Sequence, residues 1–287
     1  MPDLRGGDRD GDPCALRSDG QVRIVPAGKI RGPVKQMEPI VVDEVAEYTL
    51  TEPVLIEGLP GVGHVGKLAA EHLLEEFPST RLFEVVSEEF PPQVTVDDDG
   101  VTQLVHAAFH AVDTGERDLL VLTGDHQAQT NRGHYTLASQ FLDIAETVGV
   151  SAVYALGGVP TGELVDDPGV LAAVTESELR GPLEAVGVEF REGEPAGGIV
   201  GVSGLLLGLA ARRELPATCL MGETSGYLVD PQSARAILEV LEEMLGFTVE
   251  YASLEERAAE MAEVVEKIEQ MQMQQSAPTE DDLRYIG

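Results

Sequence analysis

The sequence predicts an α/β layered sandwich with a mostly parallel central sheet. Short apolar runs typical of strands alternate with amphipathic helical stretches from about residue 37 onwards. Four of these runs end in glycine-bearing loops, as strands of a parallel sheet do where the chain turns toward a helix. The strands that we expect are residues 54–56, 82–86, 94–96, 101–107, 119–123, 152–156 and 218–221.

Residues 1–36 differ in composition from the rest of the chain. They carry a net charge of +2, against −34 for the remainder, and show no hydrophobic period. Met37 stands directly before the strand-like run EPIVVDEV. We therefore expect residues 1–36 to be a disordered extension or the product of a misassigned start, with translation beginning at Met37. The α/β domain then spans residues 37–252.

The most informative segment is residues 54–77, where an apolar strand enters a glycine turn that opens an amphipathic helix. Gly61, Gly63 and Gly66 match the GxGxxG of a dinucleotide fold. The run from Gly61 to Lys67 matches the GxxxxGK of a phosphate-binding loop, but Leu68 stands where that loop needs Ser or Thr to hold magnesium. Close packing of a helix on a strand explains the same glycines without any ligand. All three interpretations stay open at this point, and packing is the simplest.

A β-hairpin is expected between two of the later strands. The run DDDG, Asp97 to Gly100, joins two segments of alternating polarity at residues 94–96 and 101–107. Such a turn sequence between alternating runs favours a two-stranded hairpin. We expect it as an insertion into the mostly parallel sheet.

The glycine-bearing loops after the strands predict a candidate cleft. Parallel strands end at one edge of a sheet, and ligands of open α/β sheets bind at that edge. Turns also favour Gly and Asp for conformational reasons alone, so a purely structural role stays open. The residues that would line the cleft are Gly61, Gly63, Gly66, Lys67, Asp125, Glu163 and Glu223.

Other motifs give no catalytic or metal site. His106 and His110 lie four residues apart on a predicted strand, about 13 Å from each other, which is too far to hold one metal ion. Ser203 sits in GVSGL, where Leu205 replaces the second glycine of the GxSxG nucleophile elbow. We therefore assign no catalytic residue, metal ligand or cofactor, and we expect that the protein is not an enzyme.

The charge of the chain excludes one class of partner and indicates a cellular setting. A net charge of −32 is unsuited to nucleic acid, which is bound by exchanging counterions for Lys and Arg. The chain has 19 basic residues, of which four are lysines, and its acidic residues are spread along its length. This distribution is typical of proteins in molar salt, where the Debye length is about 3 Å and self-repulsion is screened. We expect a halophilic protein.

Cysteine content and hydropathy favour the cytosol. Two cysteines cannot build a disulfide framework. The longest apolar run, Ile199 to Ala211, is shorter than the roughly 20 residues that span a membrane. We expect a cytoplasmic protein without a membrane segment.

Residues 253–275 predict an amphipathic helix that needs a partner surface. Ser253 and Glu256 form a capping box at its start. Apolar residues then recur at alternating spacings of four and three and form a narrow seam, for which packing on the protein's own domain and self-association both remain open. This seam consists of Leu254, Ala258, Met261, Val265 and Ile268.

Residues 276–287 predict a flexible docking tail. The segment is polar and then ends in an apolar and aromatic cluster. Aromatic residues on a mobile terminus give a large contact area to a partner protein. The residues that would dock are Leu283, Arg284, Tyr285, Ile286 and Gly287.

Five motifs, taken in their order along the chain, resemble the PAC2 family of archaeal proteasome assembly chaperones. The resemblance covers about residues 45–260. The motifs are PGVGHVGKLAAEHL at 60–73, TGDHQ at 123–127, GGVPTGE at 157–163, GGIVGVSGLLL at 197–207 and CLMGETSGYLVDPQSA at 219–234.

The resemblance implies an α/β domain that forms homo-oligomers and binds proteasome core particles or their α subunits without nucleotide. It also implies a docking role for a terminal motif of a hydrophobic residue, Tyr and one further residue. This chain departs from that motif, because Tyr285 is third from the end and follows Arg284. The alternative is an ATP-dependent ligase of the ATP-grasp kind that uses the sheet-edge cleft. A ligase needs paired magnesium carboxylates and a phosphate-covering loop, which the sequence does not supply.

Overall fold

The computed structural model describes residues 14–18, 21–25, 38–47, 49–193, 195 and 197–261. The chain divides into two units, Met1–Glu38 and Pro39–Gly287. The first unit contains an antiparallel pair of strands, β1 (Cys14–Ser18) and β2 (Gln21–Val25). This pair lies within residues for which the sequence indicated no regular structure. Whether translation begins at Met37 stays a prediction.

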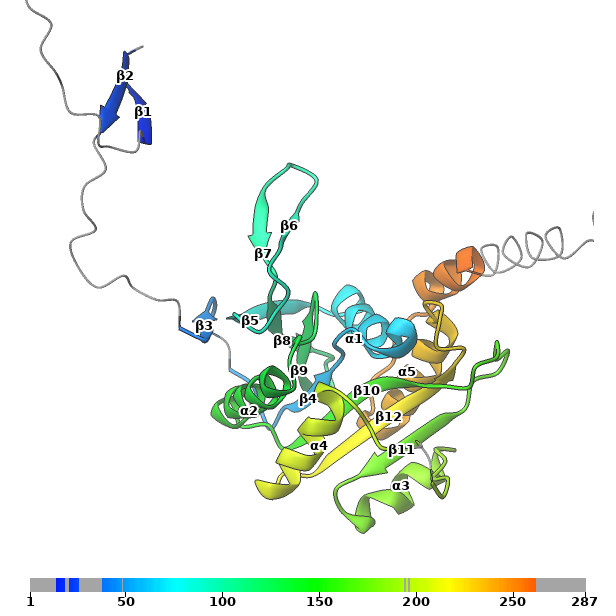
Figure 1. Ribbon diagram of the computed structural model, residues 1–287. Coiled ribbons are helices and arrows are strands. Elements are labelled where there is room, and N and C mark those ends of the chain that lie inside the picture. The colour runs from blue at the N-terminus through cyan, green and yellow to red at the C-terminus, as the bar shows by residue number, and fades with distance from the viewer. Residues whose placement is uncertain are drawn as a thin grey trace, which may run out of the picture. The chain divides into compact units, whose positions relative to one another are not determined.

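An eight-stranded sheet forms the centre of the second unit (Figure 1). Its strand order is β11-β12-β10-β4-β9-β8-β5-β3. The strands are β3 (Ile40–Glu44), β4 (Val54–Glu57), β5 (Ser79–Ser87), β8 (Ala107–Asp113), β9 (Asp118–Gly124), β10 (Ala152–Pro160), β11 (Val170–Val174) and β12 (Ala217–Thr224).

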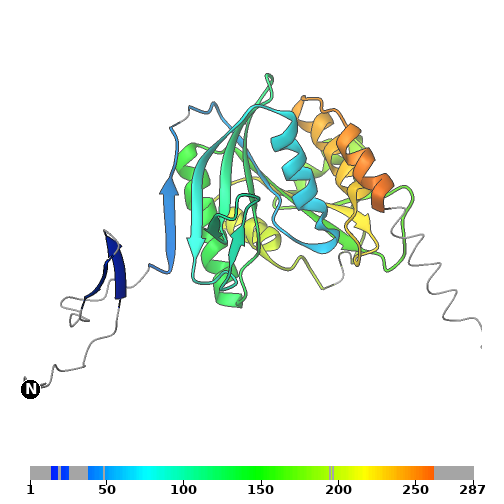
Figure 2. The ribbon, with the colours of Figure 1, turned by 90° about the horizontal axis from the view of Figure 1, so that it is seen from above.

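Parallel pairing is confined to the middle of this sheet. Strands β12, β10, β4 and β9 pair in parallel, whereas β11 on one side and β8, β5 and β3 on the other pair antiparallel to their neighbours. Figure 2 shows β3 at the outer edge of the sheet, beyond β5. The predicted α/β sandwich is confirmed, with a parallel centre and antiparallel flanks.

Helices cover both faces of the sheet, which makes three layers (Figures 1 and 2). The apolar residues of α2 (Asn131–Val148) and α4 (Val202–Arg212) pack in a hydrophobic cluster on one face. Those of α1 (Val65–Glu76), α5 (Pro231–Leu245) and the short α3 (Arg180–Ala185) belong to a second cluster on the other face. Short 3₁₀ turns, η1 (Val62–His64) and η2 (Ser177–Leu179), precede α1 and α3.

Side-chain caps fix where the two long helices begin. The Thr130 hydroxyl accepts a hydrogen bond from Gly133 N at the start of α2. The Asp230 carboxylate accepts one from Ser233 N at the start of α5, where Pro231 takes the first helical position. These are the residue types that satisfy the unpaired NH groups of a first turn.

The predicted hairpin is present but does not join the main sheet. Strands β6 (Val94–Val96) and β7 (Thr102–Leu104) pair antiparallel as a separate two-stranded sheet, which projects from the domain in Figure 1. Asp97 closes the turn by accepting hydrogen bonds from the backbone N–H groups of Asp99 and Val101. The hairpin leaves Val94, Val96 and Leu104 exposed.

The first turns of the C-terminal helix pack on their own domain. Residues 252–261 are helical and lie beside α1 and α5 in Figure 2. Leu254 is buried in the cluster that contains these two helices. Arg257 pairs with Glu75 of α1 at 2.7 Å, and Arg235 of α5 pairs with Glu255 at 2.7 Å. Within the described residues, no helix is long and apolar enough to cross a membrane.

Glycines let α1 approach the sheet more closely than any side chain would permit. A Cβ built on Gly66 would lie 2.2 Å from the carbonyl oxygen of Leu156 on β10. A Cβ on Gly58, just after β4, would lie 2.2 Å from the carbonyl oxygen of Gly66. Backbone therefore rests on backbone where β4, α1 and β10 meet, and glycine is required there.

We predict that Gly66→Ala lowers the free energy of unfolding by about 1–3 kcal/mol, because the added methyl group must displace backbone atoms. Urea denaturation followed by circular dichroism in molar KCl measures this change. Gly208→Ala in α4 is the matched control, since its Cβ would meet no atom within 4 Å. Alanine there should raise stability by up to about 1 kcal/mol. Equal effects of the two substitutions would contradict the packing role of Gly66.

Candidate functional site

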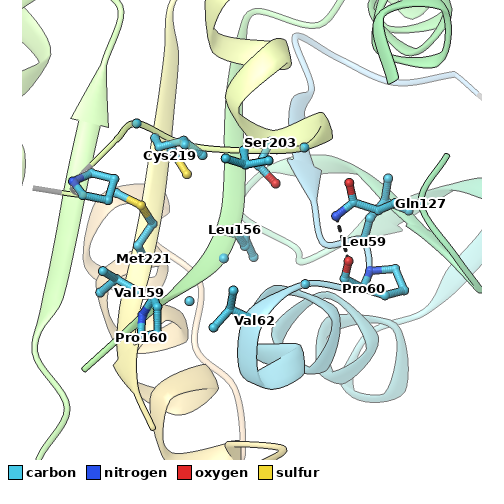
Figure 3. Close-up of a pocket in the computed structure, with 18 of the residues that line it drawn as sticks. Leu59, Pro60, Val62, Gln127, Leu156, Val159, Pro160, Ser203, Cys219 and Met221 are labelled. Carbon is cyan, nitrogen blue, oxygen red and sulfur yellow. Dashed lines mark hydrogen bonds between the residues drawn. The ribbon is translucent and has the colours of Figure 1, made fainter. Parts of the chain in front are cut away.

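The carboxyl ends of the four parallel strands lie together at one edge of the sheet. A cavity of about 550 Å³, here called the strand-exit pocket, opens at this edge. Figure 3 shows Ser203 and Gln127 on one side of it and Val159, Pro160 and Val62 on the opposite side. Its apolar lining includes Leu59, Val62, Leu156, Val159, Ile199 and Met221.

Gln127 ties together the two loops that flank the pocket. Its Nε2 donates to the carbonyl oxygen of Pro60 at 2.7 Å, and its Oε1 accepts from the backbone N–H of Val202 at 3.1 Å. The turn before η1 and the start of α4 are thus held by one side chain. Because each end of this amide makes a hydrogen bond to one of the two loops, Gln127 holds them in position.

Glu57 is the most unusual polar residue near the pocket. It ends β4 and is fully buried. Its Oε1 accepts from the backbone N–H of Leu59 at 3.1 Å, and the nearby Ser203 hydroxyl also favours the charged form of the carboxyl. Its Oε2 has no hydrogen-bond partner among the described residues. Burial raises the pKa of Glu57 to about 7, because desolvation disfavours the charged form more than Leu59 and Ser203 favour it.

Lys67 is engaged by protein groups. Its Nζ donates to the carbonyl oxygen of Gly124 at 2.9 Å and pairs with Glu71 on the next turn of α1 at 2.8 Å. A phosphate-binding lysine must point its amine into the glycine loop. Gly63 before it adopts a φ of +61° inside η1 and packs against Thr224, where a Cβ would meet the Thr224 hydroxyl at 2.7 Å. The glycines and the lysine of the motif therefore serve packing and helix anchoring.

The structure does not gather the predicted cleft residues around one cavity. Gly61 lines the strand-exit pocket, whereas the other six residues lie outside its lining. Asp125 accepts a hydrogen bond from the backbone N–H of His106 at 3.2 Å, and Glu163 is exposed. Glu223 binds Arg191 at 2.5 Å and the N–H of Gly169 at 3.1 Å. The hydrogen bond from Arg191 is the main cause that lowers the pKa of Glu223.

Sequence reasoning missed Glu57, although a signal was present. A single glutamate closes the otherwise apolar run VLIE and is followed directly by Gly58. A charged residue on a fully buried central strand is rare unless it is paired. A glutamate at the end of an apolar strand is therefore a signal for a special site, as the glycine pattern beside it is.

The described residues at this edge do not gather the ligands of a metal site. Across the described residues, no group of three or more His, Cys, Asp or Glu side chains could hold a metal ion. His134 lines the pocket, but its Nδ1 lies 2.8 Å from the carbonyl oxygen of Thr130, the N-cap residue of α2. The fold and this edge define a three-layer α/β protein with an apolar pocket at its strand exits.

Comparison with known proteins places the chain in a family. The model of the PAC2 family matches residues 55–269. This match covers well over half of the sequence, so the chain belongs to the PAC2 family, and the resemblance inferred from the motifs is confirmed. An uncharacterized protein of Methanocaldococcus jannaschii is 40% identical over 260 residues, which cover 88% of this chain and 96% of that protein.

Solved structures with the same fold include two proteins of Pyrococcus furiosus. PbaB, described as an archaeal proteasome activator, is 35% identical with a TM-score of 0.77, and the match covers 81% of this chain and all of PbaB. PbaA, described as an archaeal homolog of proteasome-assembly chaperone, is 27% identical with a TM-score of 0.68. That match covers 83% of this chain and 95% of PbaA.

The two predicted partner surfaces are described only in part. Leu254 of the seam is buried in the domain, and Ala258 and Met261 are half-buried. Val265 and Ile268 lie outside the described residues, as do all five residues of the predicted docking tail. The beginning of the seam is thus used for packing on its own domain.

Glu57 should make stability depend on pH in a direction opposite to that of most carboxylates. Its pKa is raised from 4.5 to about 7 on folding, so the folded chain binds this proton more tightly than the unfolded chain does. The stabilisation from this proton is therefore complete below the pKa of the unfolded chain, 4.5, and is lost as the pH rises through the pKa of the folded chain, about 7. We predict that, as the pH rises from 4 to 8, the free energy of unfolding of Glu57→Gln increases relative to that of the natural chain by on the order of 3 kcal/mol.

Urea denaturation of both chains across this pH range measures the difference. Glu163→Gln, which alters an exposed carboxylate at the same edge, is the control and should run parallel to the natural chain. Parallel profiles for Glu57→Gln as well would show that the buried carboxyl does not titrate with a raised pKa.

Proposed function

We propose that this protein is an ATP-independent proteasome assembly chaperone that binds the proteasome core particle or its α subunits. One observation carries the proposal: the full length of PbaB, described as an archaeal proteasome activator, matches this chain with 35% identity and a TM-score of 0.77. The match to PbaA, described as a homolog of proteasome-assembly chaperone, supports the same class of role. Membership of the PAC2 family agrees with both.

The geometry of the strand exits supports a role in binding without nucleotide chemistry. Lys67 donates to a backbone carbonyl and pairs with Glu71, and Glu223 is held by Arg191. A ligase would use such groups for phosphate and magnesium. We infer that this protein acts by binding other proteins and not by catalysis. No specific observation favours the ATP-grasp alternative.

We infer that two surfaces make the contacts with other chains. The distal part of the C-terminal helix, with Val265 and Ile268, joins copies of this protein into a homo-oligomer. The terminal residues 283–287 then dock on the proteasome, with Tyr285 as the aromatic anchor and the terminal carboxylate as a charged group for basic pockets. The spread of acidic residues supports action in a cytosol at molar salt.

Removing the docking tail should weaken capture of the proteasome. We predict that a chain ending at Ser276 and the variant Tyr285→Ala each bind archaeal core particles at least about tenfold more weakly than the full chain, because interface anchors contribute about 2 kcal/mol or more. Pull-down and surface plasmon resonance in molar KCl measure this loss.

Thr279→Ala is the matched control for these tail variants, since it alters the same segment outside the last five residues. It should bind as the natural chain does. Failure of the full chain to capture core particles or free α subunits would refute the proposed function. Normal capture by the shortened chain would refute the role of the tail alone.

Charges placed in the distal seam should break the oligomer. We predict that Val265→Asp combined with Ile268→Asp lowers the mass in solution to that of a single chain, because burying an unpaired charge costs several kcal/mol. Multi-angle light scattering measures the mass. Gln270→Asp adds charge on the opposite side of the predicted helix and should leave the mass unchanged. An unchanged mass in the double variant would mean that copies do not meet at this seam.

A further inference from the structure

The strand-exit pocket has features that neither packing nor proteasome binding requires. Its volume of about 550 Å³ lies within the range of pockets that hold small molecules. One wall is the backbone of β10 at Gly157, where a Cβ would meet no atom within 4 Å. Because residue 157 is glycine, the space that a larger side chain on β10 would occupy stays open.

A buried acceptor without a partner lies behind the wall of this pocket: Glu57 is fully buried and is not itself a lining residue, but it contacts residues that are. Leu59 and Ser203 both line the pocket; the backbone N–H of Leu59 donates to the carboxyl of Glu57, and the Ser203 hydroxyl lies close enough to lower the pKa of that carboxyl. Cys219, a third lining residue, has its pKa raised by burial and by the charge of Glu57. The carboxyl thus lies among three lining residues, with Oε2 unpaired among the described residues.

An unpaired buried carboxylate oxygen defines what a ligand must offer. Such an oxygen loses its hydration without compensation and is stabilised by any group that donates a hydrogen bond. A ligand carboxylate would instead be repelled by the Glu57 charge. The adjacent pocket is lined mainly by apolar residues, and each end of the Gln127 amide already makes one hydrogen bond to a loop.

We propose that the strand-exit pocket binds a small, largely apolar molecule that carries a hydroxyl or amine group, with this group held at the wall between Leu59 and Ser203, where the carboxyl of Glu57 behind the wall favours a donor over an anion. The apolar part of the ligand lies against Leu156, Val159 and Met221, and the donor reaches the wall between Leu59 and Ser203. This site is independent of the proposed function, because neither the distal seam nor the docking tail takes part in it.

Three matched probes test the proposal: 4-phenylbutan-1-ol, 4-phenylbutylamine and 4-phenylbutanoate. They share one apolar body and differ in the terminal group. Titration of the full chain at pH 8 in molar KCl, by calorimetry and by backbone amide NMR, gives the affinities and locates the site. We expect the alcohol and the amine to bind at least tenfold more tightly than the carboxylate, with shifts at Gly157, Gly158 and Gly201.

Two variants and one control make the test specific. Gly157→Val fills the pocket from β10, where a β-branched residue suits the strand, and should abolish binding of all three probes. Glu57→Gln should reduce the advantage of the alcohol and the amine over the carboxylate to within twofold. Glu163→Gln, exposed at the same edge, should change nothing.

The opposite results would overturn the proposal. These are absence of saturable binding by any probe, equal affinities for the three terminal groups, or unchanged binding in Gly157→Val that is still folded by circular dichroism. Each of these results leaves capture of the proteasome unaffected, so the two proposals fail separately.

Discussion

The contact of α1 with the sheet, backbone against backbone, is the constraint on which the rest of the structure depends. Gly58 and Gly66 bring the start of α1 onto β4 and β10, with Gly66 facing the carbonyl oxygen of Leu156. This approach fixes the direction in which the chain leaves β4 and sets η1 against Thr224 at the end of β12. Three of the four parallel strands are thereby tied together at their carboxyl ends. Packing of α1 on the sheet is therefore enough to determine the shape of the sheet edge at which these strands end.

That constraint explains why a phosphate-binding pattern occurs without a phosphate site. The spacing of Gly61, Gly63 and Gly66 serves a tight strand-to-helix turn, and Lys67 anchors the helix to Gly124 across the sheet edge. The same turn leaves an apolar cavity beside it, closed on the far side by the Gln127 bridge to α4. A scaffold of this kind suits a protein that presents surfaces to other proteins, and packing does not explain the buried, partly unpaired carboxyl of Glu57.

The sequence predicted the layers well because hydrophobic periodicity and strand-ending glycines are local signals. Strands β4, β9, β10 and β12 and the Asp97 turn were all expected. Strand β11 was missed, since VLAAV follows an acidic loop and carries no alternation. The candidate cleft was predicted less well, because Lys67, Asp125 and Glu223 were chosen by residue type. Their engagement by Gly124, His106 and Arg191 depends on side-chain directions that sequence spacing does not encode.

The claim that the glycine turn is a packing device is tested most directly by titrating the full chain with ATP and magnesium in molar KCl while recording the backbone amides of residues 61–68. The account predicts no saturable shift at these amides and no heat of binding by calorimetry. Saturable shifts centred on Gly63, Gly66 and Lys67, with a dissociation constant in the range of cellular ATP, would contradict it and would favour a nucleotide-using enzyme.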